Sequence, residues 1–539
     1  MTPTWFDRVI LDLGRQMRWS FLPPLMIYFS YGVSGLTAIV GTFFVKDYLG
    51  LSASFLAGLA FWVGLPWALK MPLGHLVDLI WRYKSILIYL GAGLIAVSLL
   101  IMYRLIVDPV GMAVIMPVSA WYVTSVLLAP CGYVVQDAVA DAMSVEAVPR
   151  FDDDGTPVPQ DVSRAMHTTM QTMGRFSLIS GTVAVALLNI FMFSGVDAMA
   201  DAEKASVYAR IYLIALAIPL ISVSGVLLAA VQRKRLKRRL MELGKASSAI
   251  ESALGQPDEP VTLNHWYFTG GLIFVGLSLA IGLSDFTSAQ ESVFAGSMAI
   301  VLFLMRQLVA VLDKAKARML IGTAIIIFVF RAVPLPGPGA TWFEIDVLLF
   351  DEQFLSVLSL ITAVLTLAGI IVLRPMMARR PITSIVIILT LVGGVLSLPN
   401  IGLYYGLHHW TAALTGGVVD ARFIAILDTM VESPLGQVAM IPMLAWIARN
   451  APTQLKATFF AVMASFTNLA LSASALGTKY MNEIFTVTRE VKNRLTGVVE
   501  QVADYSQLGF LLIAVMVISV VLPLLTIAVV QRTGLRTTD

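Results

Sequence analysis

Several charged side chains lie inside apolar runs of the sequence, where a charged group is energetically unfavourable. The cations of this kind are Lys70, Arg175, Arg306, Arg331 and Arg422. A charge at the centre of a bilayer costs a few kcal/mol or more unless it is paired or faces water. An arginine can also hold a carboxylate or phosphate through two parallel hydrogen bonds. Such charges are therefore candidates for function, with a structural ion pair as the alternative, and Arg306 is expected to be a snorkelling anchor.

Arg331 is the leading candidate for contact with an anion. It lies in "FVFRAVPLPGPG" (328–339), about 20 Å along a helix from Arg318, which places it near the middle of a span. We expect it to contact either a substrate or a structural partner. Asp428 lies about 15 Å into its own span and is either that partner or a proton acceptor. Glu432 shares its helix face, and two neighbouring carboxyls suit proton coupling.

The remaining charges lie nearer to the span ends. We expect Lys70 and Arg175 to line an inward cavity for an anion, although Lys70 could instead snorkel to the surface. Asp137 and Asp141 share a face at the cytoplasmic edge of the fourth span. They make either a substrate contact or a salt bridge to Lys70 or Arg175 that breaks in one conformation. Arg422 is expected near the outer edge, in a gating or structural role.

The elements that position these residues follow from composition. The chain of 539 residues is 58% hydrophobic and 13% charged, with a mean hydropathy of +0.82. Soluble domains carry about 25% charged residues. Runs of about 20 apolar residues can cross the hydrocarbon core as helices. We therefore expect an all-α polytopic membrane protein with about 14 transmembrane helices, at 20–46, 54–76, 84–107, 111–136, 167–193, 207–231, 264–284, 291–312, 319–346, 353–376, 381–399, 418–447, 454–480 and 506–530.

The distribution of Lys and Arg tests this set of spans. With the N-terminus in the cytoplasm, the cytoplasmic segments hold 24 of these residues and the outer segments hold eight. This bias obeys the positive-inside rule and puts both termini in the cytoplasm. The basic run 233–239 is then most simply an anchor on anionic lipid.

A weak internal repeat divides the chain. "FVKDYLGLSASFLAGL" (44–59) aligns with "FEIDVLLFDEQFLSVL" (343–358), with Asp47 on Asp346. The first and ninth spans are then equivalent, as in major facilitator transporters built from two six-helix halves. The expected domains are an N-terminal half at 1–231, a basic cytoplasmic linker at 232–263, an inserted helix pair at 264–317 and a C-terminal half at 318–539. The prolines and glycines after Arg331 become an interruption within a span, which is tolerated where protein or a cavity surrounds it.

One cytoplasmic loop carries a motif of the same superfamily. "GHLVDLIWRYK" (74–84) fits G-x-x-x-D-x-x-x-R with Gly74, Asp78 and Arg82. In this motif the glycine allows two helices to approach closely, and the two charges make contacts between the halves in one conformation. The alternative is an ordinary charged loop.

Segments spread over most of the chain resemble one family, the folate–biopterin transporters of the major facilitator superfamily. The similar segments are "YGVSGLTAIVGTFFVKDYLGLSASFL", "LPWALKMPLGHLVD" (65–78), "QDAVADAMSVE" (136–146), "MQTMGRFSLISG" (170–181), "LDTMVESPLGQVAMIPMLAWIARNAP" (427–452), "ATFFAV" (457–462) and "SFTNL" (465–469). The chain departs from the family in its additional span pair, in the insert at 150–161, and in Lys456 where an acid is expected.

The resemblance implies a secondary transporter that moves folate, pterin or a similar small organic anion by alternating access, with proton coupling as a symporter. One alternative is a cation-coupled sugar, peptide or drug carrier of the same superfamily. Another is a non-transporting factor that assists pigment–protein assembly. We expect a monomer in a bacterial inner membrane, whose partners are the solute and membrane lipid.

Other classes of function lack a signal in the sequence. We find no nucleophile–base constellation and no nucleotide-binding loop, so we expect neither an enzyme nor an ATP-driven pump. The chain has one cysteine, and the pair His408–His409 lacks a third ligand, so no metal and no cofactor are expected. No nucleic-acid partner is expected either.

Overall fold

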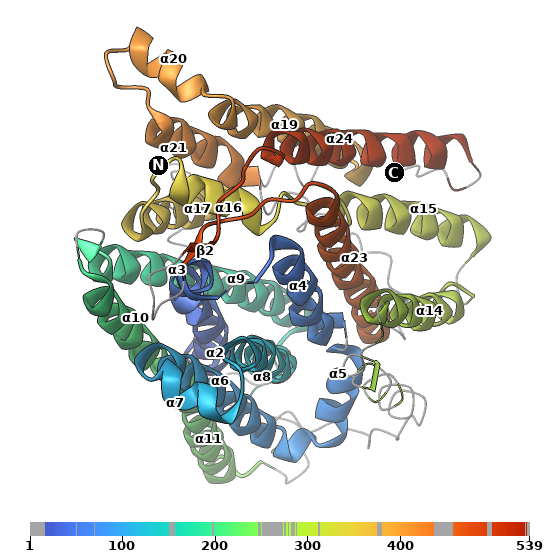
Figure 1. Cartoon of the computed structure of the whole chain (residues 1–539). Helices are drawn as coiled ribbons and strands as arrows, with labels where there is room; N and C mark the ends of the chain where they lie inside the picture. The colour runs from blue at the N-terminus through green and yellow to red at the C-terminus, as the bar shows by residue number, and fades with distance from the viewer. Residues whose placement is uncertain are drawn as a thin grey trace, which may run out of the picture. The chain divides into compact units, whose positions relative to one another are not determined.

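A computed structural model of the chain describes most of the sequence (Figure 1). The described residues are 17–49, 51–68, 70–149, 156, 158–196, 199–245, 250, 273, 276, 278, 280–281, 286, 288–310, 313–373, 380–435, 456–492, 499–533 and 535. The chain forms two compact units: unit 1 comprises residues 1–38 and 72–268, and unit 2 comprises residues 39–71 and 269–539.

Unit 1 consists of helices that pack in pairs. Its elements are η2 (Trp19–Phe21), α2 (Leu22–Val33), η3 (Ser34–Thr37), α5 (Lys70–Leu79), whose first two residues belong to unit 2, η4 (Trp81–Tyr83), α6 (Ser85–Val107), α7 (Pro109–Ile115), α8 (Val118–Glu146), α9 (Gln160–Met192), α10 (Asp201–Ala215) and α11 (Ala217–Glu242). The main pairs are α6 with α8 and α2 with α9.

Glycine explains how closely α2 and α9 approach. A Cβ on Gly32 would stand 1.9 Å from the carbonyl oxygen of Leu178, and one on Gly181 would stand 2.6 Å from that of Phe29. No other residue fits at either position without moving a backbone. The pair α6 and α8 is joined by hydrogen bonds as well, since the hydroxyl of Ser98 contacts that of Ser125 at 3.0 Å.

Unit 2 contains the remaining helices and a short hairpin. Its elements are α3 (Ala38–Tyr48), α4 (Ala53–Ala68), α14 (Ala289–Val309), α15 (Lys314–Arg331), α16 (Pro338–Asp346), α17 (Glu352–Val372), α19 (Ile382–Tyr404), α20 (Leu407–Leu414), α21 (Ala421–Glu432), η6 (Ser433–Leu435), α23 (Lys456–Ile484), β1 (Val491–Lys492), β2 (Val499–Gln501) and α24 (Leu508–Arg532). The two strands pair antiparallel, with Val491 opposite Gln501 and Lys492 opposite Val499.

Helices α4 and α23, far apart in sequence, lie along each other in unit 2 (Figure 1). The Asn468 side chain on α23 donates a hydrogen bond to the carbonyl oxygen of Trp67 at 3.2 Å. Phe61 and Leu65 of α4 pack in an apolar cluster with Leu476 of α23. Ser52 caps the start of α4, because its hydroxyl accepts a hydrogen bond from the backbone N–H of Phe55.

The predicted interruption after Arg331 is confirmed. Helix α15 ends at Arg331, residues 333–337 are irregular, and α16 begins at Pro338. Side chains at intervals of four residues on α23 form hydrogen bonds with backbone groups of this segment that have no partner within a helix. Ser474 donates to Val333 O at 2.6 Å, Thr478 accepts from Leu335 N at 2.9 Å, and Asn482 donates to Pro336 O at 3.1 Å. Three backbone groups of the interruption are thus satisfied by side chains of the protein, as an apolar environment requires.

The described helices agree with most of the expected spans. Eight are long and apolar enough to cross a membrane, and α4 and α14 are shorter apolar helices. The fourth span extends further than expected, because α8 continues to Glu146, and α11 continues to Glu242 before Gly244 ends it at φ +66°. Much of the expected span 264–284 and the second half of 418–447 lie outside the described residues.

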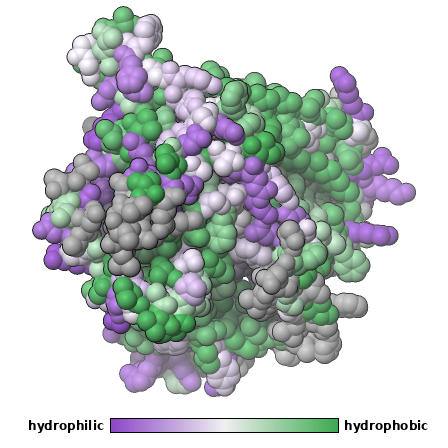
Figure 2. All heavy atoms as spheres, in the orientation of Figure 1, coloured by the Kyte–Doolittle hydropathy of each residue, from purple (hydrophilic) through white to green (hydrophobic). Residues whose placement is uncertain are grey.

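The outer surfaces of the helices are apolar, as lipid contact requires. Figure 2 shows apolar residues along α24, where Phe510, Val521, Leu525 and Val529 are exposed. A soluble protein rarely exposes a continuous apolar surface of this kind. The chain is therefore an integral membrane protein with several spans.

Candidate functional site

Arg331 is the last residue of α15, at the edge of the irregular segment. Its side chain is half-buried. Among the residues that the structure describes, no carboxylate lies within ion-pair distance of its guanidinium group. The hypothesis that Asp428 is its partner thus finds no support in this conformation.

Asp428 lies two turns into α21 and is 8% exposed. Its Oδ2 accepts a hydrogen bond from the Asn400 side chain on α19 at 3.1 Å. Its Oδ1 is buried and has no hydrogen-bond partner in the described part of the chain. A buried carboxylate oxygen without a partner is costly while the group is charged.

Two further carboxyls interact electrostatically with Asp428. Glu432 is four residues later on the same helix and is exposed. Glu344, half-buried on α16, is the other. Sequence reasoning missed Glu344 and Asn400. A sequence signal for Asn400 existed, since it follows a proline in an otherwise apolar helix (382–404).

The structure places Lys70 and Arg175 in different units. Lys70 is the first residue of α5, is half-buried and belongs to unit 2. Arg175 lies in α9 of unit 1 and is exposed. Their role in anion binding stays a prediction.

Asp141 accepts a hydrogen bond from the Tyr28 hydroxyl at 2.8 Å, which joins α8 to α2 within unit 1. Asp137 lies one turn earlier on α8, so both carboxylates are inside the helix rather than at its end. Tyr28 was not among the residues that the sequence singled out. Its ring faces Gly174 of α9, where a Cβ would stand 3.0 Å from the ring.

The structure describes only part of the G-x-x-x-D-x-x-x-R motif at 74–82. Gly74 lies in α5, and no described atom is within 4 Å of the place where its Cβ would stand. The close helix contact expected at Gly74 stays a prediction. Arg82 is exposed in η4, and the side chain of Asp78 lies outside the described residues. A gating role for the motif stays a prediction.

Arg422, near the start of α21, makes contacts that link α21 to the start of α17. It pairs with Asp351 at 2.7 Å and donates to the carbonyl oxygen of Leu349 at 3.0 Å. Its guanidinium carbon lies 5.1 Å from the centre of the Phe354 ring. Asp351 caps α17 by accepting from Phe354 N, so this contact fixes the starts of two helices.

A polar cluster, which the sequence did not predict as a contact, joins α3 to α16. Lys46 Nζ lies 2.6 Å from Asp346 Oδ1, and the Tyr505 hydroxyl donates to Asp346 Oδ2 at 2.5 Å. Burial and the hydrogen bond to Asp346 raise the pKa of Tyr505, whereas the positive charge of Arg489 acts in the opposite direction. Tyr505 therefore stays a neutral donor to Asp346.

Within the described residues no group of three or more His, Cys, Asp or Glu side chains could hold a metal ion. Among the described candidate residues, Arg331 lies at an interrupted helix and Asp428 is a buried carboxyl with an amide partner. Such an arrangement can bind a charged solute and exchange a proton.

Comparison with known proteins identifies the family. The model of the BT1 family matches residues 31–535. The chain belongs to the BT1 family. A folate-biopterin transporter of Synechocystis sp. is 23% identical over 476 residues, which cover 86% of this chain and 75% of that protein. The resemblance to folate–biopterin transporters is thereby confirmed.

Solved structures show the fold of this BT1-family chain. A POT family transporter in complex with 5-aminolevulinic acid has a TM-score of 0.61 at 14% identity, covering 96% of each chain. The nucleoside transporter NupG has a TM-score of 0.51 at 12% identity, covering 96% of this chain and all of that one. These likenesses confirm the major facilitator fold. The BT1-family chain is thus a membrane transporter, and its family is one of transporters rather than enzymes.

Proposed function

We propose that this BT1-family chain moves a small organic anion of the folate or pterin type by alternating access, with proton coupling. The substrate class rests on the folate-biopterin transporter that resembles the chain over 86% of its length. The observation that carries the proposal is Arg331, a half-buried cation at an interrupted span with no ionic partner among the described residues.

Arg331 binds the anionic group of the solute. Its guanidinium group can hold a carboxylate in two-pronged fashion. The adjacent irregular segment 333–337 has its backbone held by α23, so the place of the arginine is fixed before the solute arrives. A fixed binding group loses less entropy on binding than a mobile one.

Asp428 carries the coupling proton. When the carboxyl is protonated, its buried Oδ1 no longer bears an uncompensated charge, and Asn400 can remain its partner. When it is charged, it interacts unfavourably with Glu344 and Glu432. Proton uptake and release at this position can therefore bias the helices α19 and α21 that hold it.

Uptake into proteoliposomes tests the proposal. Radiolabelled folate and a labelled pterin should accumulate when the pH gradient is inward, and Arg331→Ala should lower this uptake by about 100-fold. Asp428→Asn should abolish accumulation driven by the gradient but preserve exchange of labelled for unlabelled solute. Uptake that neither substitution changes would refute the proposed roles.

Two variants serve as controls. Arg306→Ala removes an exposed arginine of α14, and Asp313→Asn removes a charge whose side chain is 77% exposed. Both should transport normally. Accumulation of sugars or peptides without folate uptake would favour a different substrate class, and the absence of flux for every solute would favour an assembly role.

A further inference from the structure

Two successive residues in the first turn of α14 contact two different helices. The side-chain amide of Gln290 donates a hydrogen bond to the carbonyl oxygen of Gly58 on α4 at 3.1 Å. The next residue, Glu291, contacts α23, because its Oε1 lies 3.2 Å from Lys479 Nζ and accepts a hydrogen bond from the Tyr480 hydroxyl. Helix α14 therefore bridges α4 and α23, and all three helices belong to unit 2.

The attachment of α14 to α23 is stronger than its attachment to α4. Hydrogen bonds to an ionised carboxylate are about twice as strong as those between neutral groups, and Glu291 makes two contacts of the stronger kind. The bond from Gln290 to Gly58 joins two neutral amides. Helix α14 also packs more extensively along α23 than along α4. If α4 and α23 separate, α14 should therefore stay with α23.

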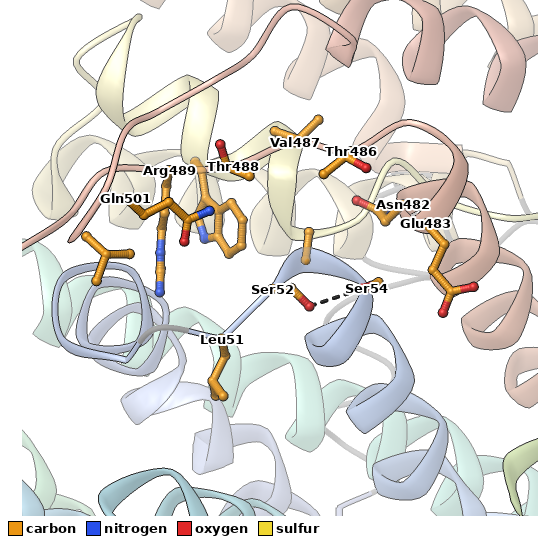
Figure 3. Close-up of a pocket in the computed structure, with 13 residues that line it drawn as sticks. Leu51, Ser52, Ser54, Asn482, Glu483, Thr486, Val487, Thr488, Arg489 and Gln501 are labelled. Atoms are coloured by element: carbon orange, nitrogen blue, oxygen red, sulfur yellow. Dashed lines mark hydrogen bonds between the residues drawn. The ribbon is translucent and has the colours of Figure 1, made fainter. Parts of the chain in front are cut away.

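A cavity of about 290 Å³ lies at the start of α4 and the end of α23 (Figure 3). Its lining includes Ser52 and Ser54 at the start of α4 and Glu483 near the end of α23. Atoms that line a cavity lack packing partners on that side. The direct hydrogen bond between the helices, from Asn468 to the carbonyl oxygen of Trp67, lies at the other end of α4. The bridge through α14 thus supports the pair where its own packing is less complete.

The pairing of α4 with α23 connects the two halves that the internal repeat defines. The repeat aligns 44–59 with 343–358, which places Ala53, the first residue of α4, on Glu352, the first residue of α17. Helix α4 is therefore expected to belong to the first half, whereas α23 belongs to the second. Alternating access moves one half against the other. A contact between the halves at one end of these helices has to break when the transport path opens at that end.

We infer that α14 is a latch, which stays on α23 through Glu291 and releases α4 by breaking the hydrogen bond between Gln290 and Gly58. The inference rests on alternating access in the proposed function, and it gives the additional helix a role in the conformational cycle. The glycine suits this contact, because a Cβ at position 58 would stand 2.9 Å from the Gln290 amide nitrogen. A larger residue would push the amide away from the carbonyl oxygen.

Distances between spin labels test the latch without any solute. The only cysteine, Cys131, is first replaced in Cys131→Ser. One label is then placed on α14 at Phe303 and the second either on α4 at Phe55 or on α23 at Ile484, side chains that are 54%, 47% and 61% exposed. Double electron–electron resonance on the full-length protein in liposomes should show two populations for the pair on α4 and α14, and one for the pair on α14 and α23.

Substitutions at the latch should shift these populations. Gln290→Leu removes the donor, and the ratio of the longer to the shorter distance between α4 and α14 should rise about two- to tenfold, as expected for one neutral hydrogen bond. Gly58→Ala should act in the same direction. Gly296→Ala is the matched control on α14, since its Cβ would meet no described atom within 4 Å, and the ratio should stay unchanged.

Two outcomes would overturn the inference. One is a distance between α4 and α14 that neither Gln290→Leu nor Gly58→Ala changes. The other is a distance between α14 and α23 that changes as much as that between α14 and α4. Because these distances require no solute, they decide the inference even if the parent protein takes up no folate, a result that would count against the proposed function instead.

Uptake then connects the latch to transport. In the variant with Gly58→Cys and Gln290→Cys, a bifunctional methanethiosulfonate reagent should join α4 to α14 and stop folate uptake. Dithiothreitol cleaves this link and should restore uptake, so the same protein serves as its own control. Uptake that continues while the link is intact would show that α4 and α14 need not separate, which would also overturn the inference.

Discussion

The contact between Lys46 and Asp346 should stabilise unit 2 measurably. Their charged atoms are 2.6 Å apart, and the side chains are only 16% and 24% exposed. Ion pairs on exposed surfaces contribute about 0.2–1 kcal/mol. Removal of one partner from a fully buried pair costs about 3–5 kcal/mol. Since this pair is partly buried and Asp346 also accepts from Tyr505, we expect a coupling free energy of about 1–2 kcal/mol.

A double-mutant cycle isolates this coupling. The variants are Lys46→Met, Asp346→Asn and the double substitution, and the free energy of unfolding is measured by denaturant titration of the protein in detergent micelles. Lys46→Met should lower the free energy of unfolding more in the parent protein than in the Asp346→Asn variant, and the same should hold for Asp346→Asn with and without Lys46→Met. The difference between the two costs is the coupling free energy.

The pair of Arg104 and Asp108 provides the matched control, because its atoms are 3.2 Å apart but the side chains are 56% and 42% exposed. Its coupling should stay below about 0.5 kcal/mol. A coupling for Lys46 and Asp346 as small as that of the control would refute the reasoning that partial burial strengthens the contact.

Three further predictions concern other parts of the structure. Gly32→Ala should lower the thermal unfolding midpoint strongly, because its Cβ would stand 1.9 Å from a carbonyl oxygen of α9. Gly35→Ala is the control, because its Cβ would meet nothing within 4 Å and the midpoint should stay unchanged. Equal shifts of the midpoint in the two variants would contradict the close approach of α2 and α9. Thr478→Val should cost about 1–3 kcal/mol of unfolding free energy in denaturant titration, since Leu335 N–H loses its acceptor; an unchanged value would be inconsistent with that bond. Burial and the neighbouring imidazole lower the pKa of His408 below its usual 6.5, so its contribution to stability is present above that pH and is lost as the pH falls. His408→Gln should flatten the pH profile of the unfolding midpoint below about pH 6.5, and a profile identical to that of the parent protein would argue against this role.

The sequence predicted the features that depend on local pattern. Apolar runs located the spans, and the alignment of 44–59 with 343–358 placed the interruption after Arg331 within a span. Short helices were missed, because α7 and α20 have only 7 and 8 residues and no periodic apolar stripe long enough to recognise.

Partners between helices could not be predicted, because they depend on how each helix is rotated. The repeat aligned Asp47 with Asp346 as equivalent positions of the two halves, which does not say which side chain Asp346 contacts; in the structure Asp346 pairs with Lys46. A shift of one residue turns a helical side chain by about 100°. For the same reason, Asp428 could be placed in its span but not matched to Asn400.

The interruption between α15 and α16 has an electrostatic consequence. The peptide dipoles of a helix sum to a partial negative charge at its C-terminus and a partial positive charge at its N-terminus. Arg331 is the final residue of α15, so its charge lies at the end that attracts cations. This attraction is about 0.3–1 kcal/mol at an exposed helix end and up to about 2 kcal/mol when partly buried. The main chain itself therefore offsets part of the cost of placing this half-buried cation in apolar surroundings. In an uninterrupted helix Arg331 would lie between the two ends and lose this stabilisation.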